Sequence, residues 1–484
     1  LTLNVAGEVM QSEFGSIVVG GYATVAANVI TLDNVSNDFQ GAVDASGSDV
    51  EITDANSLSL ADIDASGDLV VSALAGAIDD GVSGLVGEDV NVGGVATFNA
   101  TGAISLDDAA NDFAAVVNTV GTDISLSDAN DIAIGKVVAN GGLTITASAG
   151  AIVGTGRVQV SGQSNLQAAG VVSLVNSLNG FVQAINANAA AVELKGSVDL
   201  VLGMVNASTL DLEIIGSISQ DASGLSISGD VNLVALGNKD VTLNRTANVL
   251  DGTVTVLAFD VELVNSVGVE LGDFDVDSLA VRVAGAGDIV QVAGTSMDVR
   301  LDATFVAVDN HVQLDSVSNK FNGSVSVEAD TLVLKNSQLT FLGSIDVNEL
   351  SVMVLNNEAI RQSSGGAVVV SGNSQFTAVN NQVLLGSTDN DFGGTVNVLG
   401  SQVVLAAKDA IHLGAIFATA LDVSVDGLGD IAQDSAGLVV SGASAFATQG
   451  DILLTEEGNL LSGAVNLTGD DAAIMNATDI VLGD

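Results

Sequence analysis

The sequence predicts an all-β protein, a parallel β-helix (β-solenoid) built from repeats of about 70 residues with roughly three coils each. Three observations predict it. A ten-residue frame recurs seven times, the chain has 55 glycines and no proline, and short runs of alternating apolar and polar residues separated by Gly, Asn, Asp and Ser follow one another throughout. Such runs are typical of strands and turns, and no apolar stripe of helical period persists over three turns. We therefore expect essentially no helix.

The recurring frame begins with Ile or Val, has Leu at its third position and Asn at its eighth, and ends with Phe or Leu. The even spacing of the asparagines sets the period of the repeat at roughly 70 residues. The seven copies are Ile30–Phe39, Ile104–Phe113, Val172–Phe181, Val241–Leu250, Val312–Phe321, Val383–Phe392 and Ile452–Leu461. We take two sets as the structural signature of the repeat: Asn37, Asn111, Asn179, Asn248, Asn319, Asn390 and Asn459, and Phe39, Phe113, Phe181, Phe321 and Phe392.

The other strands of each repeat follow the frame in a constant order. An alternating run such as Val50–Thr53 comes first, then a run of the pattern Leu-x-Leu-Gly such as Leu200–Met204. A glycine turn leads into a strand that ends in Gln, as in Gly216–Gln220, and a run with Ser-Gly at its centre, such as Val368–Phe376, closes the unit. These strands cannot bury themselves alone, so we expect them to stack coil on coil in parallel ladders.

Composition supports a structure held by ladders and packing. Proline cannot donate to a ladder, which explains why a chain of strands lacks it. Cysteine is also absent, so neither disulfides nor thiolate metal sites exist. The aromatic share is only 3%, and the predicted core is Val, Ile, Leu and Ala with the frame phenylalanines stacked inside. We expect the frame asparagines in one column, every third or so coil, at a corner with left-handed backbone, their amides bonded to Asn or backbone of neighbouring coils.

The formal charge is −48, from 59 acidic and 11 basic residues. This balance argues against nucleic acid and against an anionic membrane surface as partners, because binding to either needs clustered Lys and Arg. Membrane insertion is not expected either, because no apolar stretch of the sequence is long enough to span a bilayer. A large charge of one sign keeps a long solenoid soluble. We expect no cofactor, although loosely bound Ca²⁺ fits the acidic turns.

The residues that could carry catalysis are scattered. Adjacent acidic pairs such as Asp79/Asp80 and Asp107/Asp108 occupy different positions of the repeat, and basic residues occur singly. The spacing of the two histidines, His311 and His412, is not a multiple of the period. A glycosidase or lyase needs clustered carboxylates with a base, so we expect no enzyme and no catalytic residue. No aromatic platform for a sugar is visible.

The chain spans almost a whole number of units, and we expect residues 1–484 to be one continuous solenoid of about seven repeats, cut within a repeat at both ends. Neither end reads as an atypical capping repeat. We therefore expect the solenoid to continue on both sides, either covalently or by subunits that join end to end.

Three strings carry a resemblance to a known family: ITLDNVSNDFQGAV, VEITDANSLSLADIDASGDLVVSALAGAI and VNVGGVATFNATG. They resemble the repeat shafts of filamentous-haemagglutinin-like proteins, the bacterial exoproteins of two-partner secretion and related repeat-rich autotransporters. The resemblance covers all seven units. It implies a right-handed β-helix, an extracellular or cell-surface location, and adhesion to a host or neighbouring cell or scaffolding. The family's secretion domain uses Asn-Pro motifs, and the chain has no proline.

These observations favour a non-catalytic structural shaft of a secreted bacterial adhesin or extracellular fibre. Two alternatives remain. One is a self-assembling filament subunit joined end to end by β-strand stacking. The other is a carbohydrate-active or carbohydrate-binding β-helix.

Overall fold

The computed structural model describes residues 1–81 and 89–483. Every regular element in the described residues is a β-strand, and every pairing between strands is parallel, so the all-β solenoid prediction is confirmed. The same residues contain no helix long and apolar enough to cross a membrane. Two compact units divide the chain, Leu1–Val249 and Leu250–Asp484, and β33 (Val249–Leu250) holds the last residue of one and the first of the other.

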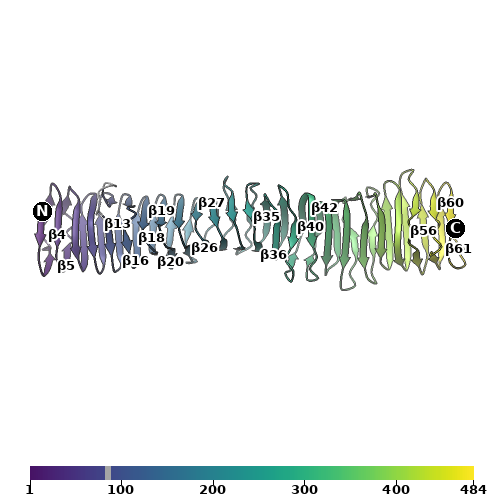
Figure 1. The fold of residues 1–484 in the computed structure, drawn as a ribbon, viewed down its shortest axis with the longest axis horizontal. Helices are drawn as coiled ribbons and strands as arrows, with labels where there is room; N and C mark the ends of the chain where they lie inside the picture. Colours follow the sequence, from purple (N-terminus) through teal and green to yellow (C-terminus); the bar gives the residue numbers. More distant parts are fainter. Residues whose placement is uncertain (82–88, 484) are drawn as a thin grey trace. The chain divides into compact units, whose positions relative to one another are not determined.

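In the first unit the strands form two main ladders, here called ladders I and II (Figure 1). Consecutive members of each ladder pair in parallel, one coil apart. Ladder I contains β2 (Glu8–Met10), β5 (Val29–Leu32), β8 (Asp49–Asp54), β10 (Leu69–Ala73), β13 (Ala96–Ala100), β16 (Val116–Gly121), β18 (Ile132–Ala139), β20 (Ile152–Gly154), β23 (Val171–Leu174), β26 (Ala191–Gly196), β28 (Thr209–Ile214) and β31 (Val231–Ala235). Ladder II contains β1 (Thr2–Asn4), β4 (Ala23–Ala26), β7 (Val43–Gly47), β9 (Leu58–Ala65), β11 (Ile78–Asp79), β14 (Ile104–Leu106), β17 (Ile124–Asp128), β19 (Leu143–Ala147), β22 (Ser164–Ala168), β25 (Ile185–Asn188), β27 (Leu200–Ala207), β29 (Ile218–Gln220) and β32 (Val241–Leu243).

Short strands branch from the ladders of the first unit. The second halves of the eight-residue strands β9, β18 and β27 pair with a separate short strand, while their first halves continue the ladder. The branches begin at β12, β21 and β30, and the first two continue to a two-residue strand that ends on a frame Phe. The branch strands are β12 (Val90–Val92), β15 (Asp112–Phe113), β21 (Val158–Val160), β24 (Gly180–Phe181) and β30 (Leu225–Ile227). The short strands β3 (Val18–Val19) and β6 (Asp38–Phe39) form a separate two-stranded sheet.

The second unit follows the same plan, with ladders III and IV and the same kind of branch. The long strands β40 (Ala303–Leu314) and β42 (Ser324–Asn336) each contribute to both ladders, because the chain passes from one to the other without a break. Ladder III adds β34 (Thr253–Leu257), β36 (Val269–Val276), β38 (Ile289–Gln291), β44 (Glu349–Val354), β47 (Ser374–Ala378), β50 (Thr395–Leu399), β52 (Ile411–Ala418), β54 (Ile431–Gln433), β57 (Ile452–Leu454) and β60 (Ala472–Ile474). Ladder IV adds β35 (Asp260–Asn265), β37 (Ser278–Val283), β43 (Thr340–Val347), β45 (Ile360–Gln362), β48 (Val383–Leu385), β51 (Gln402–Ala407), β53 (Ala420–Val425), β56 (Ser444–Ala447), β59 (Ala464–Thr468) and β61 (Val481–Leu482). The branches are β39 (Met297–Val299), β41 (Lys320–Phe321), β46 (Val368–Val370), β49 (Asp391–Phe392), β55 (Leu438–Val440) and β58 (Leu460–Leu461).

The expectation of a single asparagine column is wrong, because a repeat contains three and a half coils instead of three. The frame strands of the first and third repeats, β5 and β23, both belong to ladder I, seven pairings apart, whereas those of the second and fourth, β14 and β32, belong to ladder II. The second unit repeats the alternation, since the frame strand of the sixth repeat, β48, lies in ladder IV and those of the fifth and seventh in ladder III.

The core of each unit is made by alternate residues of every strand. Strands such as β10 and β19 bury their odd residues and leave the even ones half-exposed, as the period of two requires. The frame phenylalanines Phe39, Phe113, Phe181, Phe321 and Phe392 are at most 2% exposed. Three of them meet another core Phe edge to face, with ring centroids 6.0 to 6.4 Å apart: Phe98 with Phe113, Phe305 with Phe321, and Phe376 with Phe392.

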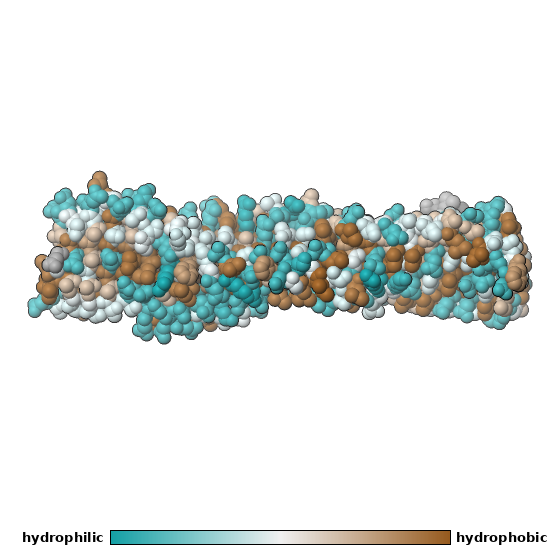
Figure 2. All heavy atoms as spheres, turned by 180° about the vertical axis from the view of Figure 1, so that it is seen from behind, coloured by the Kyte–Doolittle hydropathy of each residue, from teal (hydrophilic) through white to brown (hydrophobic). Residues whose placement is uncertain are grey.

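Exposed apolar side chains lie in several separate places. On the face shown in Figure 2, hydrophobic residues lie between hydrophilic ones along the surface. Among residues 1–81 and 89–483, the most exposed large apolar side chains are Phe14 at 94% and Leu428 at 80%, one in each unit.

Candidate functional site

All seven frame asparagines are fully buried, and each is used inside the fold. The side-chain oxygen accepts a hydrogen bond from a backbone N–H of the preceding coil, for example Val158 N to Asn179 Oδ1 at 2.8 Å. In six repeats the amide nitrogen donates to the carbonyl of the frame leucine five residues earlier, as from Asn179 Nδ2 to Leu174 O at 3.0 Å. A single side chain thus ties the turn to the coil below.

None of these asparagines has a positive φ, so the expected left-handed backbone is wrong. Each ends a turn instead. The N–H of Asn37 donates to the carbonyl of Asn34 at 3.0 Å, and Asn179 does the same to Asn176. The last residue of such a turn needs no left-handed conformation. Asparagine is therefore required for its side chain, which supplies both an acceptor and a donor.

A glutamine one coil earlier pairs with the asparagine in five repeats. In the sixth repeat Gln362 Nε2 donates to Asn390 Oδ1 at 2.6 Å, and Asn390 Nδ2 donates back to Gln362 Oε1 at 3.2 Å. We call this reciprocal pair of side-chain amides the amide clasp. Its members are Gln11 with Asn37, Gln220 with Asn248, Gln291 with Asn319, Gln362 with Asn390, and Gln433 with Asn459.

Two repeats replace the glutamine. In the second, Asp80 Oδ2 accepts from Asn111 Nδ2 at 2.8 Å and from the N–H of Asp108 at 3.0 Å. In the third, β20 ends in Gly154 where β29, β38, β45 and β54 end in Gln, and Asn179 keeps its two backbone partners. The asparagine is thus the constant member of the clasp and the glutamine a variable one.

A second polar side chain caps the backbone of the tenth frame residue. It follows that residue by 15 positions: Asp54 Oδ2 accepts from the N–H of Phe39 at 2.6 Å, and Asn336 Oδ1 from that of Phe321 at 3.0 Å. Five repeats have this cap, the others being Asp128, Asn265 and Asn476. At the same spacing the third and sixth repeats have Gly196 and Ala407, which cannot accept through a side chain.

In the first six repeats the strand at the Leu-Gly position, which is Leu60-Ala61 in the first repeat, contains a β-bulge whose extra residue shifts the register of the ladder. Asn186 Oδ1 accepts from the N–H of Met204 at 2.8 Å, directly after Gly203. A Cβ on Gly203 would lie 2.2 Å from the same oxygen, so only glycine fits beside the cap. The equivalent contact joins Gly135 to Asn118 and Gly414 to Asn397.

Buried carboxyls are concentrated in the first two repeats. Burial raises the pKa of Asp54, Asp80 and Asp128, and the hydrogen bonds that each accepts lower it in part. Burial, together with the neighbouring charge of Asp64, also raises the pKa of Asp44 and Asp62. A site with little water disfavours the charged form of a carboxyl, which accounts for the common direction.

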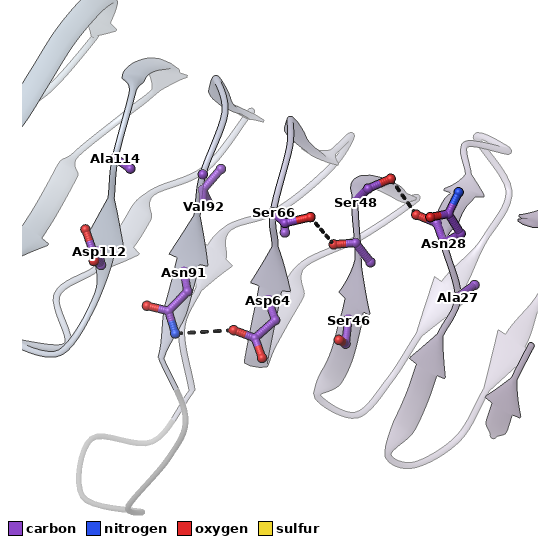
Figure 3. A pocket seen from close by; sticks show the side chains of 13 residues that line it. Ala27, Asn28, Ser46, Ser48, Asp64, Ser66, Asn91, Val92, Asp112 and Ala114 are labelled. Carbon is purple, nitrogen blue, oxygen red and sulfur yellow. Dashed lines mark hydrogen bonds between the residues drawn. The ribbon is translucent and has the colours of Figure 1, made fainter. Parts of the chain in front are cut away.

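A groove runs across β4, β7, β9, β12 and β15 in the first unit (Figure 3). Its outward residues Ser46, Asp64, Asn91 and Asp112 are in register on consecutive coils. Asn91 Nδ2 donates to Asp64 Oδ1 at 3.5 Å and to Asp89 Oδ2 at 3.2 Å, so the amide separates the carboxylates. A parallel row of Asn28, Ser48 and Ser66 lies beside it, with the serine hydroxyls donating to backbone carbonyls.

The histidines lie in the second unit with their side chains about half exposed. The Nδ1 of His311 lies 3.9 Å from Asp330, and that of His412 lies 4.0 Å from Asp434. Among residues 1–81 and 89–483, no three His, Cys, Asp or Glu side chains gather in a way that could hold a metal ion.

Seven consecutive segments match the model of a family described as Repeats of unknown function (DUF5649): residues 1–46, 47–120, 121–188, 189–257, 258–328, 329–399 and 400–468. The chain belongs to this family. Each matched segment ends nine residues after a frame asparagine, at residue 46 after Asn37 and at residue 120 after Asn111, so the DUF5649 repeat has the period of the clasp. No curated protein and no solved structure matches the chain.

Proposed function

We propose that these DUF5649 repeats form a non-catalytic structural shaft of a secreted bacterial adhesin or extracellular fibre. One observation supports the proposal most. The polar residues that recur in every repeat, the frame asparagines, are 0% exposed and bond to other parts of the fold. The frame asparagines therefore recur because each repeat needs one to hold its turn to the preceding coil. A site that binds or reacts would instead keep its recurring polar groups at the surface.

The surface charge fits the same role. A net charge of −48 makes neighbouring solenoids repel one another, which keeps long exported chains apart. Loosely held Ca²⁺ would accompany this charge without a fixed site. Equal melting temperatures in calcium and in EDTA would agree with loose binding, whereas a large drop in EDTA would mean that calcium is part of the fold.

Surface labelling tests the location directly. Antibodies raised against the chain are applied to intact and permeabilised cells of the organism that encodes it, with an antibody to a cytoplasmic protein as control. We expect labelling of intact cells and lower attachment of cells in which the gene is deleted. Labelling that requires permeabilisation would contradict the proposal. Negative-stain images at several concentrations test the filament alternative, which requires fibres that lengthen with concentration.

A further inference from the structure

The first unit has a second groove, across β19, β22, β25 and β27, and its lining contains no charged side chain. Two rows of outward residues cross it in register. One row is Thr144, Asn165 and Asn186, and the other is Thr146, Gln167, Asn188 and Asn206. Coils in parallel ladders are about 4.8 Å apart, so the rows present an amide or hydroxyl at each such step.

Several of these polar groups are open to a ligand. Asn186 Nδ2 donates to Asn165 Oδ1 at 2.8 Å, and Asn206 Nδ2 donates to Asn188 Oδ1 at 3.0 Å. Those bonds fix the orientation of the amides and leave the donors of Asn165 and Asn188 toward solvent. The side chain of Gln167 is exposed and has no hydrogen-bond partner among the described residues. Met204, 63% exposed, adds an apolar surface to the same groove.

The second unit has a groove at the same place in its repeat. It crosses β42, β44, β47 and β50, and its central row is Ser351, Gln375 and Asn397. Unlike the first groove, it has one charged side chain, Glu349, in its lining beside this row. These residues correspond to Thr144, Asn165 and Asn186: Asn186 and Asn397 both accept the N–H that follows a bulge glycine. Two units thus present an uncharged polar row at one position of the repeat.

We propose that these two amide-lined grooves bind an uncharged linear polysaccharide. Side-chain amides both donate and accept, which suits the hydroxyls of sugars, and their regular spacing along the ladder suits a polymer of similar units. The charge selects the ligand: a protein of net charge −48 repels polyanions, and cations prefer the groove that holds Asp64 and Asp112. These amides were not predicted from the sequence, because they come from different coils and lie side by side only in the stacked structure. The proposal goes beyond the shaft function and does not depend on it.

Affinity electrophoresis of the full chain tests this binding. The gels contain hydroxyethylcellulose, xylan, laminarin or galactomannan, with polygalacturonate as the anionic comparison. The groove variant carries Asn165→Ala, Gln167→Ala and Gln375→Ala, all at outward positions. The control variant carries Gln159→Ala and Gln402→Ala, which remove outward amides outside both grooves. Equal melting temperatures of the three proteins show that folding is retained.

We expect at least one neutral polysaccharide to retard the wild type, no retardation by polygalacturonate, and at least tenfold weaker binding by the groove variant with the control unchanged. Three results would overturn the proposal: no neutral polysaccharide bound, polygalacturonate bound as tightly, or a groove variant that binds like the wild type. Any of these would leave the shaft function untouched.

Discussion

Replacing Asn390 by alanine removes the constant member of one clasp. Its Oδ1 accepts from the N–H of Val368 at 2.9 Å and from Gln362. Its Nδ2 donates to the carbonyls of Leu385 at 3.3 Å and Ala406 at 3.1 Å. Alanine leaves the buried Val368 N–H without an acceptor, which costs about 1–3 kcal/mol, and the other lost bonds add about 1 kcal/mol or less each. We expect Asn390→Ala to lower the local free energy of unfolding by about 3–5 kcal/mol.

Gln362→Ala is the matched comparison. It leaves Asn390 with three backbone partners, Val368 N, Leu385 O and Ala406 O. The third repeat resembles this variant, because Asn179 has no glutamine partner there and bonds to Val158 N and Leu174 O. The expected loss is about 1–2 kcal/mol. Because a solenoid can open locally, the assay is native-state hydrogen exchange of peptides from β46 to β49, supported by urea unfolding. A loss below about 1 kcal/mol for Asn390→Ala, or equal losses for both variants, would refute the assignment of the clasp as the main tie between coils.

Three further substitutions test the other buried polar positions. Asp80→Gln restores the clasp to Asn111 and should raise stability at pH 7 by about 1 kcal/mol. Because burial raises the folded-state pKa of Asp80, its carboxyl favours folding below the unfolded-state pKa and loses that contribution as pH rises through the folded-state pKa. The variant should therefore show a smaller fall in urea midpoint from pH 4 to pH 7 than the wild type, and an unchanged fall would contradict this. Ser164→Ala removes a buried hydroxyl that has no hydrogen-bond partner within the described part of the chain and should stabilise by about 1 kcal/mol in thermal melts, whereas a lower melting temperature would contradict the absence of a partner. Gly135→Ala would place a Cβ 2.3 Å from Asn118 Oδ1 and should cost about 2 kcal/mol or more, measured by urea unfolding; a neutral result would mean that the bulge is not held by this cap.

The sequence was sufficient to predict the fold class, the period and the buried phenylalanines. Frame positions such as Leu32 and Phe39 alternate with polar residues, and alternation alone assigns them to the inside of a strand. The expected bonds between the asparagine amides and backbone of neighbouring coils are present, as from Val158 N to Asn179 Oδ1, whereas the full burial of the asparagines was not predicted. What each asparagine contacts could not be predicted, since Gln220 and Asn248 are 28 residues apart whereas Gln11 and Asn37 are 26 apart, and Asp80 interrupts the pattern.

The sequence could not show that a repeat contains three and a half coils, because the coils within a repeat have different lengths. The coil that leads from Val117 to its partner Ile134 is shorter than the coil that leads from Ala96 to its partner Val117, so coils differ in length within a repeat. The bulge beside Gly135 changes the spacing again, because Val117 pairs with Ile134 whereas Thr119 pairs with Val137, and in the sequence Gly135 looks like an ordinary turn glycine. The amide-lined grooves were hidden for the same reason, because their residues come from different coils.

The central claim is that a repeat advances the solenoid by three and a half coils, and one distance within the first unit tests it. The chain has no cysteine, so spin labels attach only to Cys introduced at Thr31 and Ser173, outward positions of β5 and β23. Double electron–electron resonance should give about 34 Å, seven coils at about 4.8 Å each. A distance of about 29 Å, which corresponds to six coils, would contradict the alternating ladders and support three coils per repeat.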